Sequence, residues 1–358
     1  MTDQTVSLTV GARTPRAVDV LPAPDAARPV RSLYIHTPFC AHKCHYCDFY
    51  SFVDEGKMGP DVQRAFVDRL AAELRALAPW ARGEPLRTVF IGGGTPSLLR
   101  VELWRELLGV LDGAFDLSAI RAATEQGALV SPAQSGGAPS PAEPEEGGLP
   151  EFTVECNPES TTEELCGVMK AGGVTRVSLG AQSFVARHLK TLERWHDPDN
   201  VERSLERVRA AGIGRQSVDL IYAIPGQTLA EWESDLERAL ALGTTHLSCY
   251  NLTYEPQTQM TARMKRGEFV PVEEDLEASM FEAATRRLEA GGLARYEVSN
   301  YAAPGMESRH NLAYWLQEDW LAAGPSASGH VRGVRTKNVG NLRRYLEGSE
   351  EGGTSLLS

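Results

Sequence analysis

From Ser32 onward, short apolar runs alternate with longer amphipathic segments, and this alternation restricts the fold more than any other feature of the sequence. Seven runs have the length and apolar character of buried strands: 32–39, 87–94, 152–158, 174–180, 216–225, 245–252 and 294–300. Five segments between them repeat apolar residues at helical spacing: 61–78, 97–111, 200–212, 228–243 and 273–292. Strands that alternate with helices predict βαβ units and a parallel sheet.

The number of units decides between two α/β architectures. We count about six, fewer than the eight of a closed barrel. Because βαβ crossovers are right-handed, about six units carried round in one direction predict a partial (β/α)6 barrel. An open, doubly wound sheet is the alternative. In both architectures the functional residues gather at the carboxyl ends of the strands.

Three segments lack this alternation. Residues 1–30 hold four prolines and no periodicity, so we expect a disordered extension. Residues 131–150 hold five prolines and four glycines, and we expect 121–150 to be a flexible surface insertion. The polar residues 346–358 are expected to form a disordered tail. The core is therefore predicted over 31–300, with an extension over 301–345.

Charge and hydropathy exclude several classes of partner. The net charge is −12 and no basic stripe stands out, so nucleic-acid binding is not expected. No apolar run reaches the length of a membrane-spanning helix, so any membrane association is expected to be indirect. The first 30 residues lack an apolar secretory core, and the expected location is the cytoplasm.

The stretch "CAHKCHYC" (40–47) places three cysteines directly after the first predicted strand. In a reducing compartment, clustered cysteines are more often metal ligands or redox groups than disulfides. A [4Fe–4S] cube has four irons, each normally held by one thiolate. Cys40, Cys44 and Cys47 would hold three irons and leave the fourth open to an exchangeable ligand. The spacing therefore predicts a cluster with one reactive iron.

Two other interpretations of these cysteines stay open. A structural zinc site takes four ligands, usually as two separated C-x2-C pairs, and His42 or His45 could supply the fourth. Alternatively, the three thiols carry no metal. The remaining cysteines, Cys156, Cys166 and Cys249, are scattered and are expected to be small buried hydrophobes.

The C-x3-C-x2-C spacing resembles the hallmark of the radical S-adenosylmethionine (SAM) superfamily. The resemblance implies that SAM chelates the open iron through its amino and carboxylate groups. In that superfamily the cluster donates an electron to SAM, and cleavage gives methionine and a 5′-deoxyadenosyl radical that abstracts hydrogen. The protein's contribution is to position and shield these groups.

Further motifs narrow the resemblance to one branch. Five occur in order: "LYIHTPFCAHKCHYCDFYSF" (33–52), "VFIGGGTPSLL" (89–99), "VECNPES" (154–160), "SLGAQSF" (178–184) and "DLIYAIPGQT" (219–228). Over about residues 31–345, apart from the insertion, they resemble the branch that contains oxygen-independent coproporphyrinogen III dehydrogenase and the HemW heme chaperones.

This resemblance implies a set of SAM contacts. In "IGGGTP" (91–96), glycines without a Cβ let the backbone approach a ligand closely, and Gly93, Gly94 and Thr95 are expected to meet the methionine end of SAM. Matching positions at strand ends and near the cluster add six further candidates for SAM or cluster contacts: Tyr34, Tyr46, Glu155, Gln182, Arg194 and Asp219. An arginine suits a carboxylate because its fork donates two hydrogen bonds.

Two features favour the chaperones over the dehydrogenases. The dehydrogenases carry a further cysteine two positions after Cys47, where this chain has Phe49. The segment "RHNLAYW" (309–315) also resembles the chaperone branch. On a helix His310 and Tyr314 would share a face. His310 could ligate heme iron, since imidazole suits iron, or it could serve packing and hydrogen bonding.

The resemblance therefore implies a heme chaperone that binds a [4Fe–4S] cluster, SAM and heme, accepts electrons from a reductant and delivers heme to an acceptor protein. Radical oxidative decarboxylation of coproporphyrinogen III is the alternative, and a degenerate protein that keeps only the cluster is a third. Both relatives usually continue into a small helical C-terminal domain. The end of this chain, 341–358, is polar and aperiodic, so that domain is expected to be missing or truncated.

Overall fold

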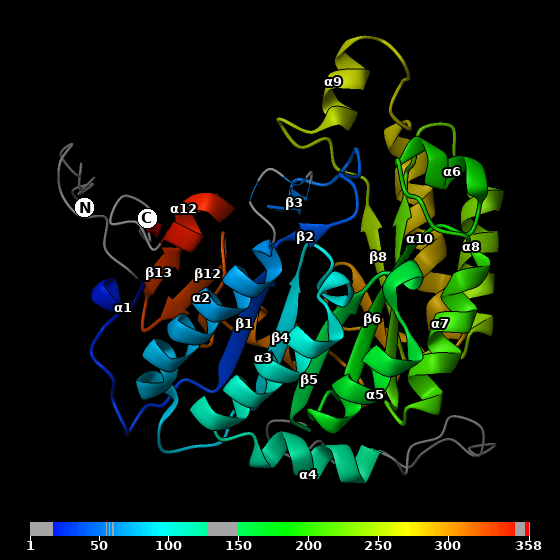
Figure 1. The fold of residues 1–358 in the computed structure, drawn as a ribbon. Helices are drawn as coiled ribbons and strands as arrows, with labels where there is room; N and C mark the ends of the chain where they lie inside the picture. The colour runs from blue at the N-terminus through cyan, green and yellow to red at the C-terminus, as the bar shows by residue number, and fades with distance from the viewer. Residues whose placement is uncertain are drawn as a thin grey trace, which may run out of the picture.

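The structure, a computed structural model, describes residues 17–54, 56, 58, 61–127, 149–347 and 355–357. A single large sheet runs through it, with the strand order β11-β1-β4-β5-β6-β7-β8-β10-β9 (Figure 1). Its six central strands are parallel to one another: β1 (Ser32–Thr37), β4 (Thr88–Gly93), β5 (Glu151–Cys156), β6 (Arg176–Gln182), β7 (Arg215–Tyr222) and β8 (His246–Asn251). Strand β11 (Leu321–Ala323) extends one edge in parallel, and the antiparallel β10 (Asn300–Ala302) and β9 (Ala294–Arg295) extend the other.

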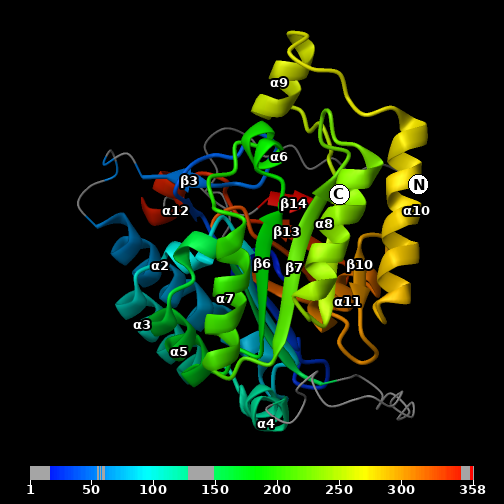
Figure 2. The ribbon, with the colours of Figure 1, turned by 90° about the vertical axis from the view of Figure 1, so that its right-hand side faces the viewer.

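The main helices cover one face of this sheet (Figures 1 and 2). They are α2 (Val62–Leu77), α3 (Val101–Ala114), α5 (Glu163–Ala171), α7 (Asp199–Ala210), α8 (Leu229–Ala241) and α10 (Glu274–Ala290). A doubly wound sheet reverses its strand order at a switch point and carries helices on both faces. Here the order from β1 to β8 never reverses. The partial (β/α)6 barrel is therefore confirmed, and the doubly wound alternative is wrong.

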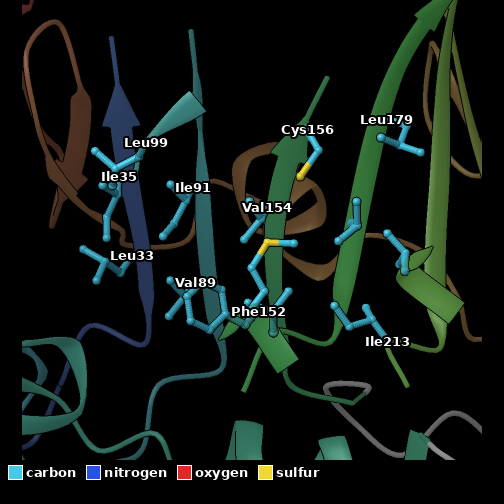
Figure 3. Close-up of a cluster of buried hydrophobic side chains, with 14 of the residues drawn as sticks. Leu33, Ile35, Val89, Ile91, Leu99, Phe152, Val154, Cys156, Leu179 and Ile213 are labelled. Atoms are coloured by element: carbon cyan, nitrogen blue, oxygen red, sulfur yellow. The ribbon is translucent and has the colours of Figure 1, made fainter. Parts of the chain in front are cut away.

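The alternation of side chains along each strand separates the core from the inner face of the barrel. Leu33 and Ile35 of β1 point into the apolar layer beneath the helices, as do Val89, Ile91, Phe152 and Val154 from the next two strands (Figure 3). The residues between them, Tyr34 and Glu155 among others, therefore face the barrel interior. Cys156, Cys166 and Cys249 are buried in the apolar core, as expected.

Several boundaries differ from the sequence-based expectation. Residues 96–98 form a separate 3-10 turn that begins at Pro96, and α3 begins only at Val101. The seventh predicted strand, 294–300, is split into β9 and β10, because the chain turns back and Tyr296 N donates to Asn300 O at 3.1 Å. The short helix α5 was not predicted, although Thr162 caps it by accepting from Leu165 N.

The segments expected to be disordered are partly structured. Within 1–30, residues 17–20 form α1 (Ala17–Val20), Val30 N donates to Trp80 O, and Trp80 Nε1 donates to Pro22 O. The first residues of the predicted insertion belong to helix α4 (Ser118–Gly127), while 128–148 lie outside the described residues, as do 1–16. In the predicted tail, β14 (Ser355–Leu357) pairs with β13 (Val334–Lys337).

The remaining described elements are shorter. They are β2 (Phe39–Cys40), β3 (Phe52–Val53), β12 (Ser328–Val331), β13 (Val334–Lys337), α6 (Ala186–Thr191), α9 (Gln259–Lys265), α11 (Arg309–Trp315) and α12 (Leu342–Glu347), with 3-10 turns at Ala78–Ala81, Pro96–Leu98 and Pro158–Ser160. No helix among the described residues is both long and apolar enough to cross a membrane.

A buried carboxylate on α2 fastens the C-terminal elements to the barrel. Glu73 accepts hydrogen bonds from Gly324 N at 3.0 Å, from Asn338 Nδ2 at 2.7 Å and from Tyr345 Oη at 2.6 Å. Breaking such a fully bonded buried charge is costly, because its partners lose their acceptor as well. The segment 321–345 is therefore part of the same packed body as β1, whereas the predicted loss of a further helical domain stays a prediction.

Candidate functional site

The loop after β1 carries the three clustered cysteines to the carboxyl edge of the sheet (Figure 1). Cys40 ends the short strand β2, Cys44 is buried, and Cys47 N donates to Cys44 O at 3.3 Å, which closes a tight turn. All three thiols are free. The cysteine loop therefore lies at the carboxyl ends of the strands, as the sequence predicts.

The three thiols differ in acidity. Burial alone would raise the pKa of Cys44, but a hydrogen bond from His42 and the positive charge of Arg194 outweigh it and lower that pKa. Arg194 Nη1 lies 3.8 Å from Cys44 Sγ. Burial raises the pKa of Cys40, and it raises the pKa of Cys47 to about 11. The loop thus already stabilises one thiolate, the protonation state that binds metal.

The donor set fits an iron–sulfur cube. Three thiols lie on one loop beside a guanidinium that offsets negative charge, and a cube takes each thiolate on a different iron. No group of three or more His, Cys, Asp and Glu side chains within the described ranges is arranged to hold a single metal ion. His42 Nε2 bonds to Glu193 O at 2.9 Å and His45 Nδ1 bonds to Arg263 at 3.1 Å. Both histidines thus have other partners than a zinc ion.

The glycine loop after β4 packs against the cysteine loop. Gly94 N donates to Thr37 O and Thr95 N donates to Phe39 O, both at 2.7 Å. A Cβ on Gly93, whose φ is +106°, would lie 2.5 Å from the His36 ring, and one on Gly94 would lie 2.7 Å from Phe39 O. Packing against His36 and Phe39 therefore already requires glycine at both positions. The close approach of a ligand, which motivated the prediction, would be a second reason for glycine here.

Two carboxylates, one on β5 and one on β7, face the barrel interior. Glu155 Oε2 accepts from Gly93 N at 3.0 Å, and Asp219 accepts from Ser178 Oγ at 3.0 Å. Burial, reinforced by the nearby charge of Asp219, raises the pKa of Glu155 to about 7. Burial likewise raises the pKa of Asp219 to about 6. Such buried carboxylates are suited to accept hydrogen bonds from a polar ligand that enters the barrel.

Arg194 connects the cysteine loop to β6. Its Nη2 atom donates to Gly180 O at 2.9 Å, while its buried Nε atom has no partner among the described residues. The sheet register shifts between Gly180 and Gln182, and Gln182 adopts a φ of +65°. This irregular strand end therefore lies next to a cation whose free donor suits a ligand carboxylate.

The two predicted tyrosines also lie near this interior. Tyr34 Oη bonds to His36 Nδ1 at 3.1 Å, and burial followed by the charge of Glu155 raises the pKa of Tyr34. Tyr46 packs in a small apolar cluster with Leu192 and neighbours Cys44. All the site residues predicted from sequence thus belong to the same end or interior of the barrel.

The pKa of Glu155 predicts a pH-dependent stability. Its ordinary pKa is 4.5 and its folded value is about 7, so the folded chain holds a proton that the unfolded chain releases. The stabilising effect is fully present below pH 4.5 and is lost as the pH rises through 7. Glu155→Gln should remove this decline and raise the free energy of unfolding of the cofactor-free chain above pH 7 by about 3 kcal/mol. Urea unfolding at several pH values measures this free energy. If the free energy of unfolding depends on pH in the same way in the parent and the variant, the prediction is wrong.

His36 was missed by the sequence analysis. It is buried, its Nε2 bonds to Tyr50 O at 2.8 Å, and burial lowers its pKa to about 4. It therefore links β1 to the exit of the cysteine loop. The only available signal was a polar residue at an inward-facing strand position in "LYIHTPF" (33–39).

His310 occupies a fully bonded position. Its Nδ1 bonds to Thr88 Oγ1 and its Nε2 to Tyr314 Oη, both at 2.8 Å, and burial lowers its pKa to about 4. The backbone N–H of His310 donates to Glu151, which itself pairs with Arg176. Both nitrogens of the His310 ring therefore have partners, and neither is free to bind a heme iron. This arrangement favours the packing and hydrogen-bonding role over the ligand role.

Comparisons with known proteins agree with this site. The profile of the radical SAM superfamily matches residues 34–239. The heme chaperone HemW of Lactococcus lactis is 36% identical over 316 residues, which span 88% of this chain and 74% of the relative. HemW of Bacillus subtilis is 34% identical over 319 residues, which span 89% and 76%.

A solved structure shares the fold. Coproporphyrinogen III oxidase (HemN) from Escherichia coli, described as a radical SAM enzyme, superposes with a TM-score of 0.73 at 21% identity, over 94% of this chain and 74% of that one. From the profile match, the HemW relatives and the cysteine loop we conclude that the chain belongs to the radical SAM superfamily, within the HemW family, and binds a [4Fe–4S] cluster and SAM.

Proposed function

We propose that this protein is a heme chaperone, which binds heme at the carboxyl end of its barrel and passes it to an acceptor protein in the cytoplasm. One observation carries the proposal: relatives named heme chaperone HemW match almost nine-tenths of the chain at 34–36% identity. Fold alone would not suffice, because the same barrel serves many reactions.

The residues of the site support a division of roles. Cys40, Cys44 and Cys47 would hold the cluster and leave one iron without a thiolate, where SAM would bind. When bound, the cluster supplies one-electron reduction. Arg194, whose buried Nε–H has no partner among the described residues, would hold the SAM carboxylate, and the buried carboxylates Glu155 and Asp219 would accept hydrogen bonds from the polar groups of SAM.

An exposed aromatic side chain beside the cysteine loop supports heme binding. Phe49 is 63% exposed and lines an open cavity of about 410 Å3 together with Lys43, Cys47 and the segment 255–258. Heme is a flat, largely apolar macrocycle, so an exposed aromatic ring on the wall of an open cavity matches its chemistry. We place the heme against Phe49 in this cavity.

Anaerobic reconstitution with iron and sulfide followed by two parallel assays tests the function. Heme titration should shift the Soret band at about one heme per chain. Coproporphyrinogen III incubated with SAM and reductant should stay unconverted. Formation of protoporphyrinogen IX with SAM consumed in step would instead make the protein a dehydrogenase, and absence of both activities would favour a degenerate protein that keeps only the cluster.

Phe49→Ala should weaken heme binding about tenfold, because the ring surface buried by the macrocycle is lost. Phe49→Leu should retain part of that affinity, and the exposed Val270→Ala should retain all of it. Equilibrium titration of the three variants measures the effect. Equal heme affinity of Phe49→Ala and the parent would move the heme site away from this cavity.

A further inference from the structure

A buried carboxylate on α8 lies behind the end of β6, on the helix side of the sheet. Asp235 is 1% exposed, its Oδ2 accepts from Ser183 Oγ at 2.6 Å and its Oδ1 accepts from Phe184 N at 2.9 Å. It forms no ion pair with another described residue, and the nearby Arg238 pairs with Asp199 instead. Burial raises the pKa of Asp235. A buried carboxylate is costly unless its oxygens are bonded, so the role of Asp235 lies in the backbone that these two hydrogen bonds hold.

The backbone held by Asp235 is the irregular end of β6. Gln182, directly before Ser183, has a φ of +65°, which a residue with a side chain adopts at a cost. Such a conformation persists only where the surrounding contacts fix it. Within the turn, Ser183 N donates to Ala181 O at 2.8 Å. The two hydrogen bonds to Asp235 fix the same turn from the helix layer.

The same face of α8 also fastens α6, which follows the turn. Ser183 Oγ accepts from Val185 N at 3.1 Å, and Val185 caps α6 without a side-chain hydrogen bond of its own. Glu231, one turn before Asp235 on α8, pairs with Arg187 in the first turn of α6. In both ribbon views α6 lies above α8 at the carboxyl end of the sheet (Figures 1 and 2). Two carboxylates of one helix therefore fix the start of α6.

Candidates for SAM contacts lie at both ends of this fastened segment. Gln182 begins it, and Arg194 follows α6, where Arg194 N donates to Leu189 O at 2.8 Å. A Cβ on Gly180 would lie 2.7 Å from Gln182 Nε2 and 2.9 Å from Arg194 Nη2. The amide and the guanidinium therefore both lie over Gly180, on the interior face of β6. A shift of the segment between them would move both groups.

We propose that Asp235 is a positioning residue for SAM binding. Through Ser183 and Phe184 N it fixes the turn that carries Gln182, and through α6 it fixes the place of Arg194. Asp235 lies on the helix side of the sheet and the ligand enters the barrel interior, so it acts through the backbone and does not touch SAM. The inference rests on the proposed SAM contacts of Gln182 and Arg194, and it is independent of heme binding.

Asp235→Ala tests this role by calorimetric titration of the anaerobically reconstituted protein with SAM. We expect SAM to bind about tenfold more weakly than in the parent, because hydrogen bonds that support the binding groups are lost. The iron content should stay at about 4 per chain, since Asp235 bonds to the turn after β6 and not to the cysteine loop. Asp235→Asn, which keeps one acceptor oxygen for Phe184 N, should recover part of the affinity. Unchanged SAM affinity in Asp235→Ala would overturn the proposal.

Two further variants on α8 separate positioning from a general loss of stability. Glu237→Ala removes an exposed carboxylate that pairs with Arg287 at 3.0 Å, and it should bind SAM as the parent does. Leu236→Val removes one carbon from a fully buried side chain, so it should lower the free energy of unfolding in urea and leave the SAM affinity unchanged. If Leu236→Val weakens SAM binding as much as Asp235→Ala does, the positioning role is wrong.

The path through Ser183 is tested by combining substitutions. Ser183→Ala removes one of the two hydrogen bonds and should weaken SAM binding severalfold. Added to Asp235→Ala, it should weaken binding little further, because the bond that Ser183 donates is already lost. If the effects of the two substitutions multiply as independent ones do, Asp235 does not act through Ser183.

Hydrogen exchange of the cofactor-free chain gives a readout that does not depend on bound SAM. The amide of Phe184 loses its acceptor in Asp235→Ala and should exchange about tenfold faster than in the parent, together with that of Val185. Amides in the middle of α2 should exchange at the rate of the parent. Equal exchange of Phe184 in both proteins would show that Asp235 does not hold the turn. Failure of the heme proposal would appear instead as an unshifted Soret band in the parent, with these SAM and exchange results unaffected.

Discussion

Alanine in place of Cys40, Cys44 or Cys47 is expected to abolish the brown colour of the reconstituted protein and about 4 Fe per chain with it. In the proposed assignment each of these thiolates holds one iron of the cube, and the fourth iron has no protein ligand. A cube with two remaining thiolates has two open irons and is lost. Iron and sulfide analysis after anaerobic reconstitution measures this result directly.

The three other cysteines provide the matched controls. Cys156, Cys166 and Cys249 are buried in the apolar core, where alanine removes one small group and costs on the order of 1 kcal/mol. Their alanine variants should keep the full iron content. Loss of iron in all six variants would show that the effect is on folding, and loss in one core variant alone would assign a ligand outside the loop.

The barrel could be predicted from sequence because its signals are local. Leu33 and Ile35 alternate with polar residues in one short run, and each such run predicts its own strand whatever the rest of the chain does. The cysteine spacing is equally local. Six parallel strands and the place of the loop at their carboxyl ends follow from these two signals.

The missed features depend on contacts between distant residues. Strand β11 has three residues, too few for any periodicity, and it is defined only by its pairing with β1 at the other end of the chain. Trp195 and His42 meet only because α6 ends beside the cysteine loop. In the sequence Glu73 is an ordinary polar residue of a predicted helix. Its buried role depends on hydrogen bonds from Asn338 and Tyr345, which lie far away in the C-terminal segment.

The glycine loop shows how a correct assignment from sequence can give an incomplete mechanism. The sequence predicts that Gly93 makes room for a ligand, and on that basis a larger residue would remove SAM and spare the cluster. In the structure the space beside Gly93 is already occupied by His36. His36 holds Tyr50 O, next to the end of the cysteine loop. A side chain at Gly93 therefore disturbs the loop as well as the ligand.

Gly93→Ala should consequently lose both SAM binding and most of the cluster iron, and Gly93→Val should do so completely. The methyl group would lie 2.5 Å from the His36 ring, on a residue whose φ of +106° is unfavourable for any L side chain. Together these effects should cost about 3 kcal/mol or more of unfolding free energy. Calorimetry with SAM, iron analysis and urea unfolding measure the three consequences.

Two other glycines separate the causes of this loss. Gly243 also has a positive φ, +67°, but no atom lies within 4 Å of its missing Cβ, so Gly243→Ala carries backbone strain without a clash. Gly113 lies in α3 with open space around it, and Gly113→Ala should stabilise the helix by about 1 kcal/mol. Neither variant should lose iron or SAM. If Gly93→Ala keeps its iron and loses only SAM, His36 yields to the new methyl group and the glycine serves the ligand alone. If Gly93→Ala keeps both, the loop is not the contact between cluster and cofactor.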